Sequence, residues 1–196
     1  MTYTKLFTFC QTQKVHVKRN TIKEETLNLV GKPKVSVMMT GVDLEITRGF
    51  FVSARNTDHP LVQKFGTDII VLARGMNRCW TRFVMIKELM HIFDDPAEQT
   101  STDAEFDTLM TDLTSGNTPG EWAPQMRSEN RCHWMALALF CPEDERQDLL
   151  QKRDKKEITD YEIALRLRIP ELYVRNLFRP NFTGIVQWLR DRTSAG

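Results

Sequence analysis

The stretch that most constrains the fold is residues 80–95, W-T-R-F-V-M-I-K-E-L-M-H-I-F-D-D. Its apolar residues recur three and four positions apart, which is the spacing of one buried helix face. This apolar set comprises Phe83, Val84, Ile86, Leu89, Met90 and Phe93. Thr81 is a candidate N-cap, and Pro96 lies just beyond the Asp94-Asp95 pair that ends the run. The sequence therefore predicts one amphipathic helix here, packed on the core of the protein.

Within this helix the segment K-E-L-M-H, residues 87–91, approaches a metal-binding pattern. Zinc peptidase helices carry H-E-x-x-H, because side chains four positions apart share a helix face and two imidazoles can hold one metal. The Glu that follows the first His then acts as the general base. Glu88 and His91 stand in register with this motif, but Lys87 replaces the first His. The segment is thus an H-E-x-x-H motif that lacks one ligand.

Composition excludes several classes of protein. The chain has 196 residues, enough for one domain with a substantial core, and its formal net charge of +1 provides no overall field for nucleic acid or acidic membranes. The four cysteines lack C-x-x-C spacing and no secretory leader is recognised, so we expect reduced thiols in a cytoplasmic protein. No apolar run approaches the roughly 20 residues that a membrane span needs.

Short β-rich runs precede the predicted helix. They are V-S-V-M-M-T from Val35, L-E-I-T-R-G-F-F-V-S-A from Leu44 and D-I-I-V-L-A from Asp68. The last run is almost continuously apolar, as expected of a buried strand. We therefore predict a mixed α+β fold in which a small antiparallel sheet of about three strands packs on the helix.

The segment after Pro96 is acidic and polar, and it ends in the loop S-G-N-T-P-G-E-W-A-P. Residues 95–125 are therefore interpreted as an insertion beside the main helix, with Trp122 buried. A second helix follows, with Ser128 as candidate N-cap and Pro142 at its end. Its nearly continuous apolar content indicates a central position.

The remainder of the chain is expected to be helical. Thr159 and Glu162 form a T-x-x-E capping box, Pro170 is a candidate first-turn proline, and residues 183–192 form a last amphipathic helix. The predicted organisation is an N-terminal extension (1–34), a core (35–142) that contains the insertion, and a C-terminal helical group (143–196) packed on that core.

Glu129 completes a candidate site, because an H-E-x-x-H centre needs a third protein ligand and a Glu on a following helix is a common choice. It lies 38 positions after His91 (129 − 91). With these pieces the sequence resembles the ImmA/IrrE family of metallopeptidases, which cleave phage-type and radiation-response transcriptional repressors. The matching pieces are Arg82-Phe83, Glu88-Leu89, His91, Glu129, A-L-F-C-P at 138–142, and residues 163–170. The resemblance covers residues 35–179 and implies a zincin-like fold with a helix-turn-helix-like C-terminal pair.

This resemblance implies that His91 and Glu129 are zinc ligands and that Glu88 is the general base. The sequence departs from the family pattern at the metal site itself. Lys87 occupies a ligand position, Met90 replaces a small residue, and the interval from His91 to Glu129 is longer than the family usually has. A protonated ammonium has no lone pair and repels a cation. A site that retains only His91 and Glu129 is therefore expected to bind zinc weakly.

Four interpretations of Lys87 stay open. In the first, His133, which lies four residues after Glu129 and next to Cys132, supplies the lost imidazole. In the second, Lys87 is itself a ligand in its neutral form. In the interpretation that we favour, the Lys87 ammonium replaces the charge of the metal and pairs with Glu88 or Glu129, which joins the two helices. In the fourth, K-E-L-M-H is a core helix without peptidase ancestry.

The functional expectation follows from this choice. We expect a degenerate family member that binds a protein partner, a repressor or similar regulator in phage, mobile-element or stress regulation, without a cofactor. The alternative is an active zinc endopeptidase that uses His91, Glu129 and His133. A second alternative is DNA binding through arginines of the C-terminal helices, Arg166, Arg168, Arg175 and Arg179, which the near-neutral charge disfavours.

Overall fold

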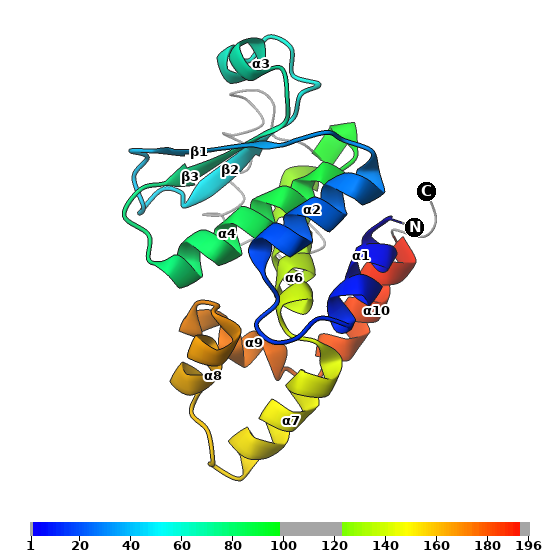
Figure 1. The fold of residues 1–196 in the computed structure, drawn as a ribbon, viewed down its shortest axis with the longest axis vertical. Coiled ribbons are helices and arrows are strands. Elements are labelled where there is room, and N and C mark those ends of the chain that lie inside the picture. The colour runs from blue at the N-terminus through cyan, green and yellow to red at the C-terminus, as the bar shows by residue number, and fades with distance from the viewer. Residues whose placement is uncertain (1, 99–122, 193–196) are drawn as a thin grey trace.

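The computed structural model describes residues 2–98 and 123–192. Most of the predicted insertion, including Trp122, lies outside the described residues. The described chain is a mixed α+β protein with one three-stranded sheet (Figure 1). Its longer elements are α1 (Thr2–Gln11), α2 (Arg19–Val30), β1 (Ser36–Thr40), β2 (Gly49–Val52), α3 (Pro60–Phe65), β3 (Ile69–Ala73), α4 (Arg78–Met90), α6 (Pro124–Phe140), α7 (Glu143–Asp154), α8 (Asp160–Leu167), α9 (Val174–Leu177) and α10 (Phe182–Arg192).

The sheet has the order β1-β3-β2, with β1 parallel and β2 antiparallel to β3. The expected three strands are present, but the prediction of an antiparallel sheet is wrong for the β1–β3 pair. All five residues of β3, I-I-V-L-A, are buried. A strand without a polar face is most stable in the middle of a sheet, so β3 lies between the two earlier strands, and burial on both faces is typical of a strand with a parallel neighbour.

Helix α4 begins earlier than the sequence suggested. Asn77 is its N-cap, with the Asn77 side chain accepting the N–H of Trp80 at 3.0 Å. The Thr81 hydroxyl instead donates to the carbonyl of Asn77 at 3.0 Å, within the first turn, so the predicted Thr81 cap is wrong. The helix ends at Met90, and His91–Phe93 continue as a 3-10 turn. His91 therefore stands at the junction of these two elements.

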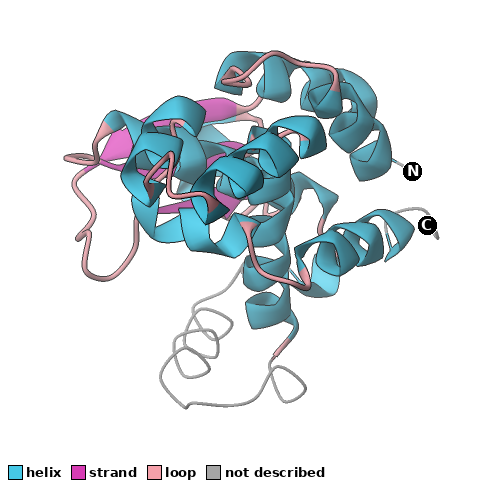
Figure 2. Ribbon diagram, turned by 90° about the horizontal axis from the view of Figure 1, so that it is seen from below, coloured by secondary structure: helices cyan, strands magenta, loops and turns pink. Residues whose placement is uncertain are grey.

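Helices α1 and α2, which are joined by a non-helical link, contribute to the core. Tyr3, Leu6 and Cys10 of α1 and Ile22 of α2 have no exposed surface. The Tyr3 hydroxyl donates to the carbonyl of Met135 at 3.1 Å, which ties α1 to α6. The strands lie together on one side of the molecule, and helices make up most of the remaining described chain (Figure 2).

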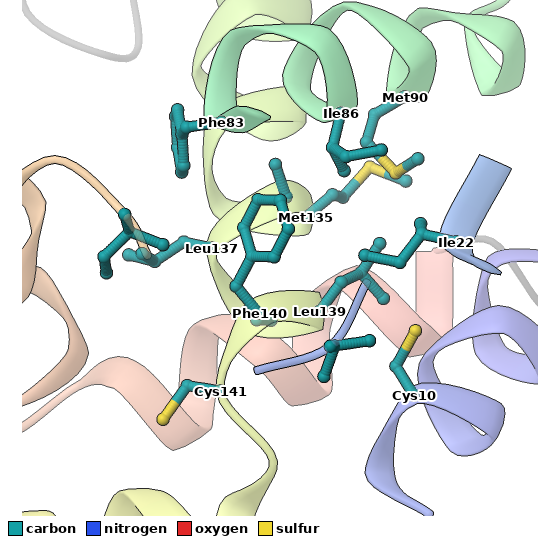
Figure 3. Packing of buried hydrophobic residues seen from close by; sticks show 14 of the residues in the cluster. Cys10, Ile22, Phe83, Ile86, Met90, Met135, Leu137, Leu139, Phe140 and Cys141 are labelled. Atoms are coloured by element: carbon teal, nitrogen blue, oxygen red, sulfur yellow. The ribbon is translucent and has the colours of Figure 1, made fainter. Parts of the chain in front are cut away.

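Helix α6 is the central helix, as its apolar content predicted. The side chains of α6, α4, α1 and α2 point toward one another in one cluster (Figure 3). The labelled members of this cluster are Cys10, Ile22, Phe83, Ile86, Met90, Met135, Leu137, Leu139, Phe140 and Cys141. The helix starts at Pro124, so Ser128 is a buried residue in its first half and the predicted Ser128 cap is wrong.

The C-terminal group largely follows the predicted pattern. The capping box of Thr159 and Glu162 at the start of α8 is confirmed. Pro170 precedes a 3-10 turn, Glu171–Tyr173, as its N-cap. Helix α10 lies beside α1, where the Thr4 hydroxyl donates to the carbonyl of Arg190 at 3.1 Å. Among the described helices, none combines the length and apolar character that a bilayer crossing requires.

Candidate functional site

The candidate residues meet where α4 crosses α6 beneath β2. Phe83, Ile86 and Met90 direct one face of α4 into the core, while Lys87 and Glu88 lie toward α6. The cap at Asn77 fixes where α4 starts. The structure brings Lys87, Glu88, His91 and Glu129 together, as the motif predicted.

Lys87 joins the two helices by ion pairs. Its Nζ lies 3.0 Å from Glu88 Oε1 and also donates to Glu129 Oε2. Burial alone would lower the pKa of Lys87, but the Glu129 and Glu88 carboxylates outweigh it and raise this pKa above its ordinary value. Lys87 is therefore a cation at neutral pH, and where pairing with Glu88 or Glu129 was expected, the structure shows pairing with both.

The two carboxylates respond differently to the same cation. The Glu88 side chain is only 2% exposed, and burial raises its pKa although Lys87 acts in the opposite direction. Glu129 is 29% exposed; burial would raise its pKa, but Lys87 and His91 lower it well below the ordinary value. At neutral pH, Glu129 is therefore the firmly ionised partner, and Glu88 depends on Lys87 for its charge.

The His91 ring is held in place through its other nitrogen. Nδ1 lies 2.6 Å from Asp94 Oδ2, and Nε2 points toward the candidate site, 3.3 Å from Glu129 Oε1 and 3.6 Å from Glu88 Oε2. Phe51 of β2 stacks on the ring with 6.2 Å between ring centres. Burial would lower the pKa of His91, but Cys132, Glu129 and the hydrogen bond to Asp94 raise it.

A group of hydrogen-bonded polar residues supports His91 from the side of Nδ1. The Ser128 hydroxyl donates to Asp94 Oδ2 at 2.6 Å, and Arg131 binds Asp94 Oδ1 at 2.6 Å and Glu98 at 2.6 Å. Burial would raise the pKa of Asp94, but His91, Ser128 and Arg131 lower it. Sequence reasoning missed these residues. The available signals were the i, i+3 spacing of His91 and Asp94 and the one-turn interval between Ser128 and Arg131 on α6.

A resident zinc ion does not fit the centre as it stands. Ligand atoms of Glu88, His91 and Glu129 lie within 4.8 Å of one another, which is compatible with a metal site. However, the charged Lys87 ammonium is already bonded to both carboxylates, and a divalent cation among them would meet a like charge at hydrogen-bond range. With Lys87 unsubstituted, this donor set is satisfied by an internal cation.

A second group of potential ligands, His91, Asp94 and Cys132, also lies within 4.8 Å. Asp94 is already bonded to His91, Ser128 and Arg131, so this group acts as the hydrogen-bonded support of the His91 ring.

His133 lies outside the candidate site. Its ring packs against those of Phe83 and Tyr173, with ring centres 5.4 and 4.6 Å apart, and Asn176 Nδ2 lies 3.4 Å from His133 Nε2. Burial lowers the pKa of His133 to about 4, so the ring is neutral at physiological pH. In the described part of the chain, neither ligand group contains His133. The geometry gives no support to His133 as a replacement ligand.

The C-terminal arginines are partly engaged within the protein. Arg166 forms an ion pair with Glu145, and the Arg179 guanidinium lies 5.7 Å from the centre of the Trp134 ring. The first contact lies within the helical group and the second joins this group to α6, so both favour a packing role over phosphate binding.

Comparisons with models of protein families, with curated proteins and with solved structures give no match for this chain.

Proposed function

We propose that this chain is a degenerate relative of the ImmA/IrrE metallopeptidases, with a zincin-like fold, that binds a protein partner without cleaving it. The observation that carries the proposal is the position of Lys87. At the residue where H-E-x-x-H supplies its first imidazole, an ammonium binds both Glu88 and Glu129. Such a centre retains the acidic residues of a peptidase site but replaces the metal charge with a side chain.

The environment of His91 supports peptidase ancestry. Metal-bound histidines commonly direct their second nitrogen to a carboxylate, which fixes the ring. His91 has this arrangement, with Asp94 behind Nδ1 and the candidate centre in front of Nε2. A core helix without such ancestry has no evident need for this support, so the interpretation as an ordinary core helix explains less of the geometry.

The neighbouring edge of the sheet supports a peptide-binding role. The carbonyl of Arg48 accepts the N–H of Ala73 at 2.9 Å, so backbone alternation directs Gly49 and Phe51 away from β3. Thr47 binds both backbone groups of Gly49, and among the described residues the backbone groups of Phe51 are left for an added strand. Because the Phe51 ring lies on His91, an extended segment paired there would pass over the centre. A segment of a repressor or similar regulator is the partner that the resemblance suggests.

Metal content tests the lost centre. Protein purified without a histidine tag and incubated with zinc is expected to retain less than stoichiometric metal by elemental mass spectrometry, whereas Lys87→His should gain zinc. About one zinc per chain in the unsubstituted protein, lost in His91→Ala, would instead support an active endopeptidase. An absence of gain in Lys87→His would argue against peptidase ancestry.

Partner binding needs a separate readout. A photo-reactive amino acid in place of Phe50, which is 36% exposed on β2, should cross-link a transcriptional regulator in the native host. Tyr161, which is 58% exposed on α8, provides the matched control position. Cross-links to a regulator from both positions, or from Tyr161 alone, would contradict a binding site at the β2 edge.

A further inference from the structure

The outer edge of β1 is open in the described structure. β1 pairs with β3, where the N–H of Ser36 donates to Asp68 and the carbonyl of Thr40 accepts from Arg74, at 2.9 and 2.8 Å. Alternate residues of a parallel strand bond to the same neighbour, so Ser36, Met38 and Thr40 face β3. The backbone groups of Val37 and Met39 consequently face the open edge.

This edge lacks the features that usually prevent strand pairing. The strand S-V-M-M-T contains neither a charged residue nor a proline, and Val37 and Met39 are 40% and 45% exposed. Edge strands are commonly protected by lysine, proline or a side chain that binds their backbone. β2 has such protection at Gly49 through Thr47, whereas within the described residues no side chain is bonded to the outward backbone groups of β1.

The charges that flank β1 are complementary to those of a second β1 strand in one of the two possible orientations. Lys34 precedes the strand and is exposed, while Asp43 and Glu45 follow it and are exposed. Lys34 has no carboxylate partner among the described residues, in contrast to Lys32, which pairs with Asp68. In an antiparallel pair of two β1 strands, the basic end of each lies beside the acidic end of the other. A parallel pair would place like charges together.

We propose that a second copy of this chain pairs with β1 in antiparallel orientation about a two-fold axis at Met38. Val37 then lies opposite Met39 of the second copy, and the outward backbone groups of both residues meet as hydrogen-bonded pairs. The two three-stranded sheets become one continuous sheet. A two-fold axis uses the same surface on both copies, which is the commonest form of homodimer.

This interface is independent of the proposed function, because it uses the edge of the sheet opposite to β2. A dimer can therefore form whether or not the β2 edge binds a partner, and the tests of the two proposals fail separately.

Oligomeric state measured by sedimentation velocity tests the interface. The unsubstituted protein is expected to be dimeric at about 100 μM, a concentration that populates even micromolar interfaces. Met39→Pro removes an outward N–H and leaves the ladder to β3 intact, so this variant should be folded and monomeric. Circular dichroism verifies that it is folded. A monomeric unsubstituted protein, or a folded Met39→Pro variant that still dimerises, would overturn the proposal.

Charge exchange tests the orientation. Lys34→Glu and Asp43→Lys should each weaken dimerisation about tenfold, because each places like charges together. The double variant Lys34→Glu/Asp43→Lys restores opposite charges and should recover dimerisation. Lys155→Glu, at an exposed lysine directly after α7, is the matched control and should have no effect, because α7 lies away from β1 at the other end of the molecule (Figure 1). Equal dimerisation of both single variants and the unsubstituted protein would refute the antiparallel pairing.

Discussion

Lys87→Ala is expected to destabilise the protein strongly, because it leaves two acidic side chains together without their cation. Removal of one member of a buried ion pair costs about 3–5 kcal/mol when the remaining charge is fully buried. Glu88, at 2% exposed, meets this condition, but Glu129, at 29%, can be reached by water. We therefore expect a loss of about 2–4 kcal/mol in the free energy of unfolding at pH 7, or roughly 4–16 °C in Tm for a chain of this size.

The loss should depend on pH with a definite sign. Burial already raises the pKa of Glu88, and removal of the Lys87 cation raises it further, so the variant regains stability as Glu88 takes up a proton. The unsubstituted protein changes in the opposite direction. The depressed pKa of Glu129 stabilises the folded state above the unfolded pKa of Glu, about 4.3, and this contribution is lost as the pH falls below it. The difference between the two proteins should therefore be largest near neutral pH and narrow under acidic conditions.

Thermal unfolding of both proteins across pH 4–8, in the presence of a chelator, measures this effect. Lys155→Ala removes an exposed lysine and should leave the Tm unchanged. In a double-mutant cycle with Glu129→Gln, the second substitution should be less costly in the Lys87→Ala background. An unchanged Tm for Lys87→Ala, or a loss that grows as the pH falls, would refute the counter-ion role.

Three further substitutions examine the support of the site. Arg82→Met should lower the free energy of unfolding by about 2–3 kcal/mol, because the Arg82 guanidinium donates to the carbonyls of Leu167, Arg168 and Val17. Denaturant unfolding measures this loss, and an unchanged midpoint would contradict the role of Arg82. Asp94→Asn should lower the free energy of unfolding by about 2 kcal/mol above pH 4. This loss should disappear at lower pH, because the unsubstituted protein then loses the stability that it gains from the depressed pKa of Asp94. A loss that is independent of pH would exclude the Asp94 charge as its cause. Gly49→Ala should lower the free energy of unfolding, measured in the same way, by about 1–3 kcal/mol. The reason is that the new Cβ would lie 2.7 Å from Val84 Cγ1 and 2.8 Å from the carbonyl oxygen of Val71. An unchanged free energy of unfolding would show that β2 can shift without loss.

The elements that the sequence predicted well are those in which local chemistry and burial agree. The all-apolar run of β3 and the T-x-x-E pair of α8 specify a buried strand and a helix start within a few residues. The strand direction was not predictable in this way, because periodicity describes one strand and not its neighbour. The predicted helix starts were wrong where more than one residue could begin the helix. Asn77 and Thr81 can both cap α4, and α6 begins at Pro124, which leaves Ser128 to form a buried contact with Asp94.

In the candidate site, too, the sequence predicted what local spacing determines and missed what long-range packing determines. The motif located Lys87, Glu88, His91 and Glu129, because helical spacing fixes which residues share a face and one long-range contact joins the two helices. It proposed His133, four positions after Glu129 on α6, as a possible ligand, and it assigned Ser128, next to Glu129, only as a helix cap. Their neighbours decide their roles: His133 meets the aromatic rings of Phe83 and Tyr173, whereas Ser128 meets a carboxylate.

The supporting residues also bear on why a lysine is tolerated at position 87. Asp94 and Arg131 orient His91 through Nδ1, away from Lys87, so this part of the site is held by contacts that need no ion at the centre. The ammonium then has one remaining task, which is to balance the two carboxylates of Glu88 and Glu129. A lysine performs it through charge, whereas a neutral residue of similar length would leave the His91 ring, 3.6 Å away, as the remaining counter-charge of the buried Glu88. On this reasoning Lys87→Met should be nearly as destabilising as Lys87→Ala, although it restores most of the lost volume.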